Sequence, residues 1–317
     1  MDNRTDRRRE NIAVVCGGRS REREISLRSG QAVLNALRNQ GLNASVVDGA
    51  QALLREVDLG KVDRVFNILH GGEGENGALA GALQVLNVPF TGCDVAGAAL
   101  SMDKARSKVV VAAAGVRVAE GLAVTRHMPM KQLDAWLSVS GQRAGRWIVK
   151  PNNEGSSVGL YQAHAPDEVA EAVQAVLSIA PVALVEEFIA GDECTVAIVN
   201  DHVLPVVRIE PAEGLYDYAA KYTSSATRYH CPSGFEPPVD HELQANARTV
   251  FDALGLRGWA RMDFILDEQR RPWFLEANTT PGMTETSLVP KAAAAYGWDF
   301  QRLVREILAT SHMEALP

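Results

Sequence analysis

The chain has 317 residues, more than a single hydrophobic core usually organises, so we expect two or three domains. Its 46% hydrophobic and 22% charged residues are typical of a globular protein. The formal net charge of −7, with acids and bases interspersed, argues against a nucleic-acid surface, so we expect no nucleic-acid partner.

Residues 1–10 are polar and basic, and we predict a disordered tail there. The apolar run that follows, Ile12–Cys16, is too short for the core of a secretory signal, and no stretch approaches the ~20 apolar residues that span a bilayer. We therefore expect no membrane association. Cys16, Cys93, Cys194 and Cys231 show neither metal-site spacing nor a dense disulfide pattern, which favours reduced thiols in a cytoplasmic protein.

Residues 11–100 alternate strand and helix patterns, which predicts a doubly wound α/β domain. Ile12–Cys16 and Val62–Leu69 are predicted to be buried parallel strands. Ser26 is expected to cap the first helix, and Gly41 to end it. The apolar stripes of the two expected helices are Val33, Leu34 and Leu37, then Leu79, Leu83 and Leu86.

Residues 101–190 are predicted to form a small α+β domain, and residues 191–317 a strand-rich domain. Ser101 is expected to cap a helix that ends at Gly115. The other elements expected in 101–190 are strands at Trp147–Pro151, Ser157–Gln162 and Val182–Ile189 and a helix at Asp167–Ile179. Those expected in 191–317 are strands at Cys194–Val199, Val203–Ile209, Gly258–Leu266 and Trp273–Ala277 and a helix at Leu243–Leu254. Pro211–Pro238 shows little periodicity, and loops of that length are usually functional.

Two short patterns point to other functions, and both fail on inspection. Gly72-Glu-Gly74-Glu-Asn-Gly77 has dinucleotide-binding spacing, but it follows a later strand and places two acids where pyrophosphate would approach. Ser101-Met-Asp-Lys104 matches S-x-x-K, yet the S-D-N and K-T-G motifs that accompany it in penicillin-binding proteins are missing. The chain also has no Walker A motif, so an ATP site here would not be a P-loop.

Two other patterns favour phosphate and metal binding. In Lys150-Pro-Asn-Asn-Glu-Gly-Ser-Ser-Val-Gly159, a lysine ends one strand and a Gly/Ser turn leads into the next, which could present backbone N–H groups to phosphate. Arg261 and Asp263 share one strand face, as do Glu276 and Asn278 on the next predicted strand. If the strands are neighbours, two carboxylates and an amide oxygen converge, a ligand set that favours Mg²⁺. The alternative is a solvated sheet face.

The motifs of this chain resemble those of D-alanine–D-alanine ligases of the ATP-grasp superfamily, and they occur in the same order along the chain. The motifs are Gly17-Gly18-Arg-Ser-Arg-Glu22-Arg-Glu-Ile-Ser26, His70-Gly71, Ser101-Met-Asp-Lys104, Glu154-Gly-Ser-Ser-Val-Gly159, Tyr216-Asp-Tyr-Ala-Ala-Lys221-Tyr222, Arg261-Met-Asp263 and Glu276-Ala-Asn-Thr-Thr-Pro-Gly-Met283. The resemblance implies a two-part ATP-grasp fold after the N-terminal domain, and the ATP-dependent joining of two D-alanines for peptidoglycan synthesis.

The resemblance also implies roles for individual residues. Those expected to bind ATP are Lys104 and Lys150 (α- and β-phosphates), Lys221 (γ-phosphate), Glu186, Glu187 and Ile189 (adenine) and Glu193 (ribose). Those expected to hold two Mg²⁺ or Mn²⁺ ions are Asp263, Glu276 and Asn278. Those expected to bind D-alanine are Glu22 (the first ammonium), Ser287 and Leu288 (the second carboxylate), and His70.

The resemblance further implies that Tyr222 links through Ser156 to Glu22 and closes the site, which favours D-alanine over D-lactate as the second substrate. Arg261 and the backbone N–H of Gly282 would stabilise the tetrahedral oxyanion. A homodimer is expected as well. The chain departs from the family pattern at Asn76, where an acid is common, and at Thr280, where serine is frequent. The rival hypotheses are an ATP-grasp ligase for another amino acid and a nucleotide-binding regulator without catalysis.

Overall fold

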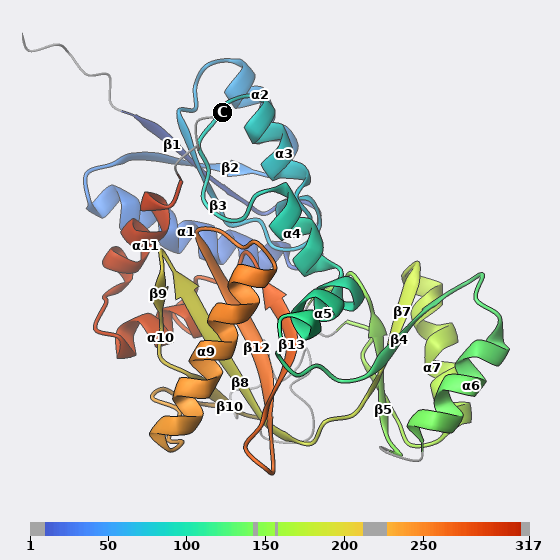
Figure 1. The fold of residues 1–317 in the computed structure, drawn as a ribbon. Helices are drawn as coiled ribbons and strands as arrows, with labels where there is room; N and C mark the ends of the chain where they lie inside the picture. Colours follow the sequence, from blue (N-terminus) through green and yellow to red (C-terminus); the bar gives the residue numbers. More distant parts are fainter. Residues whose placement is uncertain (1–9, 142–144, 156–157, 212–226, 312–317) are drawn as a thin grey trace, which may run out of the picture.

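The computed structural model describes residues 10–141, 145–155, 158–211 and 227–311. Its strands form three separate sheets. The sheet built from residues 121–187 and its helices stand to one side of the other two sheets in Figure 1. Almost all of the predicted N-terminal tail lies outside the described residues. Within them, no helix is long and apolar enough to cross a bilayer.

The first sheet is parallel, with the order β2 (Asn43–Asp48), β1 (Asn11–Cys16), β3 (Arg64–Asn67). Alternate side chains of β1 point to opposite faces: Ile12 and Val14 pack with helix α1 (Arg23–Asn39), whereas Ala13 and Val15 pack with α2 (Ala50–Asp58) and α3 (Ala78–Val85). Helices thus cover both faces, and the predicted doubly wound arrangement is confirmed. A short 3₁₀ helix, η1 (Gly72–Gly74), precedes α3.

The predicted cap at Ser26 is wrong, because α1 begins at Arg23 and Ser26 lies inside it. The hydroxyl of Ser26 accepts a hydrogen bond from the Gly17 N–H (2.9 Å) and donates one to the Ile68 carbonyl (2.6 Å). Ser26 therefore joins the ends of β1 and β3 instead of starting the helix.

The second sheet lies in the predicted small domain and is called the small sheet below. It is antiparallel, with the order β4 (Gly121–Thr125), β7 (Val182–Glu187), β5 (Trp147–Pro151), β6 (Tyr161–Ala163). Trp147 and Val149 pack in a core with α6 (Met130–Ser140) and α7 (Pro166–Ile179). Their neighbours Ile148 and Lys150 point to the opposite face, where they line a cavity.

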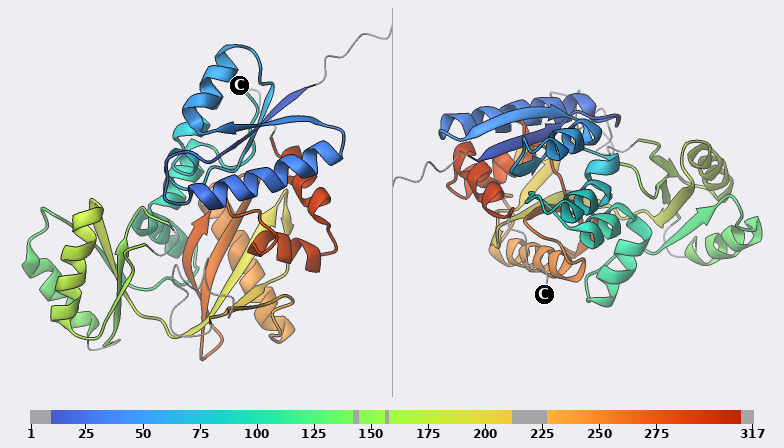
Figure 2. Two further views of the ribbon diagram at one scale, coloured as in Figure 1. Left: turned by 180° about the vertical axis from the view of Figure 1, so that it is seen from behind. Right: turned by 90° about the horizontal axis from the view of Figure 1, so that it is seen from above.

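The third sheet is antiparallel, with the order β11 (Arg228–His230), β10 (Val207–Glu210), β8 (Gly191–Val199), β12 (Trp259–Asp267), β13 (Pro272–Asn278), and β9 (His202–Val203) pairs with β8. Helix α9 (Pro237–Ala253) packs on one face. Helices α10 (Leu288–Ala295) and α11 (Phe300–Ala309) share an apolar core with the other face and with α1. The views in Figure 2 show α1 beside the two C-terminal helices.

Helices α4 (Val95–Met102) and α5 (Lys104–Ala113) connect the first sheet to the small one. The predicted cap at Ser101 is wrong, since Ser101 lies in α4 and Asp103 caps α5 by accepting a hydrogen bond from the Arg106 N–H (3.0 Å). Ala98 and Leu100 of α4 and Val110 and Val111 of α5 pack in the core of the third sheet. The domain limits at 100/101 and 190/191 remain predictions.

Candidate active site between the two antiparallel sheets

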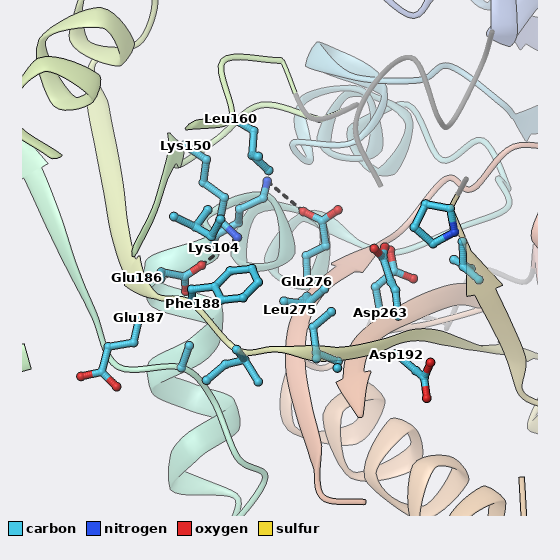
Figure 3. A pocket seen from close by; sticks show the side chains of 18 of the residues that line it. Lys104, Lys150, Leu160, Glu186, Glu187, Phe188, Asp192, Asp263, Leu275 and Glu276 are labelled. Atoms are coloured by element: carbon cyan, nitrogen blue, oxygen red, sulfur yellow. Dashed lines mark ion pairs between the residues drawn. The ribbon is translucent and has the colours of Figure 1, made fainter. Parts of the chain in front are cut away.

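A cavity of about 290 Å³ lies where β5 and β7 of the small sheet face β8, β12 and β13 of the third (Figure 3). The predicted ligands that line it are Lys104, Lys150, Glu186, Glu187, Ile189, Glu193, Asp263 and Glu276. Apolar side chains, among them Phe188, Ile265 and Leu275, line it as well. A cavity that combines apolar walls with lysines and carboxylates suits a ligand that is part ring and part anion and is bound with a cation, such as a nucleotide.

Two lysines share the buried carboxylate of Glu186. Lys150 Nζ lies 2.7 Å from Glu186 Oε2, and Lys108 Nζ forms an ion pair with Oε1. Burial alone would raise the pKa of the Glu186 carboxyl, but the charges and hydrogen bonds of the two lysines lower it to about 2. Burial lowers the pKa of Lys108 to about 8, against the opposing effect of Glu186. The pKa of Lys150 is raised, since Glu186 and Glu276 outweigh its burial.

Lys108 is a residue that sequence reasoning missed. Its one signal is spacing, because Lys104, Lys108 and Val111 fall three or four residues apart and share a helix face. In α5 that face is buried, with Lys108 5% exposed.

Lys104 lies at the start of α5 and is only 6% exposed. Its Nζ donates a hydrogen bond to the Glu154 carbonyl (2.7 Å) and lies 3.2 Å from Glu276 Oε2, an ion pair drawn in Figure 3. Asn152, just after β5, accepts from the Ala105 N–H (2.9 Å) and donates to the Asp103 carboxylate (2.9 Å). These bonds hold the start of α5 against the end of β5, which brings both predicted phosphate-binding lysines to the same cavity.

The carboxylates expected to bind metal lie on adjacent strands, as predicted. In the pairing of β12 with β13, Asp263 lies opposite Glu276 and Arg261 opposite Asn278. The register shifts by one residue just beyond Asp263 and Glu276, a β-bulge beside the site. Arg261 makes a bidentate ion pair with Asp263.

The donor set fits a hard divalent cation. Asp263 and Glu276 supply carboxylate oxygens, and Asn278 supplies an amide oxygen that accepts from the Thr280 N–H (3.1 Å). Among the described residues, no group of three or more His, Cys, Asp or Glu is placed to hold a metal ion. This does not conflict with the predicted set, which contains two carboxylates, and oxygen donors without nitrogen or sulfur favour Mg²⁺ or Mn²⁺.

The carboxylate of Glu22 lies between loops of the first and the small sheet. A methyl group on Gly71 would come within 3.0 Å of Glu22 Oε2, and one on Gly155 within 3.3 Å of the same atom. The Ser20 hydroxyl accepts from the Glu22 N–H (3.2 Å) and donates to the His70 carbonyl (2.6 Å). Two predicted D-alanine ligands are thereby tied to each other.

His70, Gly282 and Ser287 lie close together. A methyl group on Gly282 would lie 3.8 Å from His70 Nε2 and 2.9 Å from Ser287 Oγ. Burial and the Arg261 charge lower the pKa of His70 to about 4, and a hydrogen bond with the backbone of Ile68 opposes this shift only in part. Ser287 precedes α10, and Leu288 begins it with its side chain buried, so a ligand would meet the backbone N–H of Leu288.

Glu75 is a second residue that the sequence did not single out. Burial and the negative charge of Glu22 raise the pKa of its carboxyl well above the usual range. In the sequence it stood out only as one of the two acids of the Gly72–Gly77 pattern, beside Asn76, where the chain departs from the family pattern. The remaining predicted site residues, Ser156, Lys221 and Tyr222, lie outside the described residues.

The chain is similar to known proteins over most of its length. The family model "D-ala D-ala ligase C-terminus" matches residues 110–309, and "D-ala D-ala ligase N-terminus" matches residues 43–93. The D-alanine–D-alanine ligase of Pseudoalteromonas translucida (strain TAC 125) is 45% identical over 94% of this chain and 95% of its own length. That of Nitrosomonas europaea is 44% identical over 95% of this chain and 96% of its own length.

Solved structures of such ligases share the fold. The VanG D-Ala:D-Ser ligase from Enterococcus faecalis superposes with a TM-score of 0.83 at 26% identity, covering 96% of this chain and 100% of that one. The D-alanine–D-alanine ligase of Bacillus anthracis in complex with ATP gives a TM-score of 0.81 at 25% identity, covering 96% of this chain and 97% of that one. The predicted fold class is confirmed, and the chain belongs to the D-alanine–D-alanine ligase family.

Proposed function

We propose that this chain joins two D-alanines into D-alanyl-D-alanine for peptidoglycan synthesis, using ATP, through the residues gathered at the cavity between its two antiparallel sheets. The observation that carries the proposal is one cavity with lysines and carboxylates on its walls, close in the fold to Glu22 and His70. The family match over nearly the whole chain supports it independently.

The nucleotide would lie in the cavity with its adenine toward Phe188 and Ile189, residues that follow β7. Glu186 and Glu187 would face the base, and Glu193 the ribose. The phosphates would meet Lys104 and Lys150, which have the compact positive charge that phosphate oxygens need. Lys221 would add a third charge at the γ-phosphate.

Asp263, Glu276 and Asn278 would hold two Mg²⁺ or Mn²⁺ ions. Bound there, such ions neutralise charge on the transferred phosphoryl group and orient the phosphates. In the structure these acids already have cationic partners, Arg261 on Asp263 and Lys104 on Glu276. Arg261 and Lys104 thus place positive charge beside the two carboxylates that would hold the metal ions.

The reaction has two steps. A carboxylate oxygen of the first D-alanine attacks the γ-phosphorus of ATP, giving an acyl phosphate and ADP. The amine of the second D-alanine then attacks the acyl carbon, loses a proton, and expels inorganic phosphate. The chain's part is to position both substrates and to stabilise the oxyanion of the tetrahedral intermediate, through Arg261 and the Gly282 N–H.

Glu22 would bind the ammonium of the first D-alanine, and His70 would lie beside that substrate. Ser287 and the Leu288 N–H, at the start of α10, would bind the carboxylate of the second D-alanine, where the helix dipole favours an anion. Ser156 and Tyr222 would complete the link to Glu22. As the family resemblance implies, Tyr222 would close the site and so keep water from the acyl phosphate.

We further propose that the chain works in the cytoplasm as a homodimer, as the family resemblance implies. Sedimentation equilibrium of the purified protein would test the dimer. A mass of one chain at micromolar concentration would contradict it.

The experiment that tests the proposed function is phosphate release from ATP and Mg²⁺ with one amino acid set at a time: D-alanine, L-alanine, D-alanine with D-serine, or D-alanine with D-lactate. We expect release with D-alanine alone, matched by the dipeptide on a chromatogram. D-Serine is included because a structural relative is a D-Ala:D-Ser ligase. Turnover with a different amino acid only would overturn the substrate assignment, and silence with all would favour a nucleotide-binding regulator.

A further inference from the structure

Glu186 is contacted by lysines from two different elements. Lys150, from β5, and Glu186 itself line the cavity, whereas Lys108 is set back in α5. Each lysine takes one carboxylate oxygen, Lys150 Oε2 at 2.7 Å and Lys108 Oε1. All three side chains are largely buried, with exposed fractions of 13% for Lys150, 4% for Glu186 and 6% for Lys108.

This arrangement bears on how Lys150 can reach a phosphate. A buried carboxylate that loses its only cation is strongly disfavoured, so a single Glu186–Lys150 pair would hold Lys150 in place. With Lys108 on the other oxygen, Glu186 stays paired when Lys150 turns away. The charge of Lys108 also keeps Glu186 ionised, consistent with a pKa of about 2 for that carboxyl.

We propose that Lys108 is a positioning residue that retains the charge and place of Glu186 and so frees Lys150 to bind the phosphates of ATP. The inference rests on the proposed phosphate role of Lys150. In this arrangement Lys108 acts through Glu186, and its contribution grows with the number of phosphates on the nucleotide.

The test is calorimetric binding of ATP and of adenosine, without D-alanine, to the full chain and its Lys108→Met variant. We expect ATP affinity to fall roughly 10–100-fold, the range that corresponds to losing a hydrogen bond to a charged group. Adenosine affinity should fall much less, because adenosine does not call on Lys150. Equal losses for both ligands would indicate a structural role and overturn the proposal, as would unchanged ATP affinity.

The Glu186→Gln background gives a second test, because it lacks the carboxylate through which Lys108 is proposed to act. In that background Glu186 no longer holds Lys150. Adding Lys108→Met should therefore leave ATP affinity within about threefold of the affinity of Glu186→Gln alone. A further loss of about tenfold or more would overturn the proposal. This comparison decides the matter even if Lys108→Met alone does not fold.

Two controls complete the design. Lys108→Arg keeps the positive charge and should retain most of the ATP affinity. Lys61→Met removes a lysine from an exposed pair with Glu56 (3.0 Å) and should change neither affinity.

Failure of this inference can be told from failure of the proposed function. If the wild type makes the dipeptide and the Lys108→Met variant binds ATP normally, the inference about Lys108 is wrong and the proposed function stands. A wild-type protein that binds ATP without making dipeptide sinks the function and leaves the Lys108 comparison valid. A wild-type protein that does not bind ATP sinks both.

Discussion

The guanidinium of Arg261 donates two hydrogen bonds to the carboxylate of Asp263, two residues further along β12, with Nε 2.8 Å from Oδ1 and Nη2 2.8 Å from Oδ2. The residue proposed to stabilise the oxyanion is therefore paired with a residue proposed to hold the metal. Any change at Arg261 removes a donor and also releases a carboxylate that is 4% exposed. The two effects have to be separated by experiment.

Arg261→Ala should lower the turnover rate by roughly 10²–10³-fold, the usual loss for one oxyanion donor. ATP affinity should stay nearly intact, because Asp263 then has both oxygens available to the metal. Steady-state rates and ATP titrations measure the two effects separately. Arg261→Lys is the control: it keeps the charge but not the two-pronged geometry, so it should recover only part of the rate. An unchanged rate in Arg261→Ala would remove the oxyanion assignment.

Thr195→Val should weaken the metal site without changing side-chain shape. The Thr195 hydroxyl donates to Asp263 Oδ1 (2.6 Å) and is buried. Partners of metal ligands typically contribute 10–100-fold in metal affinity, so we expect the Mg²⁺ concentration for half-maximal rate to rise about 10-fold or more. Thr249→Val, which removes an exposed hydroxyl from α9, is the matched control. If both variants need the same Mg²⁺ concentration, Asp263 is not a ligand that Thr195 orients.

Several strands were predicted closely, whereas β2, β4 and β11 were not predicted at all. Trp147–Pro151 was predicted with the bounds that β5 has, and the strands around Asp263 and Glu276 were predicted to within a residue. Those runs are mostly apolar, with a few charged residues such as Lys150, Asp263 and Glu276, and this contrast with their polar flanks makes their ends visible. Val203–Ile209 was predicted as one strand, but the chain forms β9 and β10 instead, with Pro205 between them. Proline lacks the N–H that a continuous ladder would need.

Helix starts and buried charges were less predictable, since both depend on distant contacts. Ser26 looked like a cap, yet its hydroxyl bonds the ends of two strands. Lys108 looked like an ordinary helix lysine, and only the fold shows that β7 brings Glu186 to it. By contrast, the convergence of Asp263 and Glu276 was predicted on the condition that their strands are neighbours, because alternation along a strand is a local property, and the fold meets that condition.

Gly155→Ala should impair D-alanine binding more than ATP binding. The added methyl group would lie 3.3 Å from Glu22 Oε2 and 3.6 Å from Oε1, where the substrate ammonium would approach. We expect the KM for the first D-alanine to rise and the KM for ATP to change little, measured by varying each substrate in turn. Gly60→Ala is not a suitable control, because Gly60 has a positive φ that alanine rarely adopts. Ser138→Ala is suitable, since the Ser138 hydroxyl donates its hydrogen bond to the Ala135 carbonyl of the same helix, α6. Equal increases in both KM values would point to a general disturbance of the loop.

His70 should make the protein less stable in mild acid. Burial and the Arg261 charge lower its pKa to about 4, from 6.5 in the unfolded chain. Below pH 6.5 the unfolded chain takes up a proton that the folded protein does not, so stability is lost as the pH falls from 6.5 toward 4. At pH 5 this linkage amounts to about 2 kcal/mol.

Melting temperatures at pH 7.5 and pH 5 should therefore fall further apart in the wild type than in His70→Gln, which has no titrating ring. His241→Gln, at an exposed position on α9, should behave like the wild type. If His70→Gln shows the same acid sensitivity as the wild type, the imidazole is not held neutral in the folded protein.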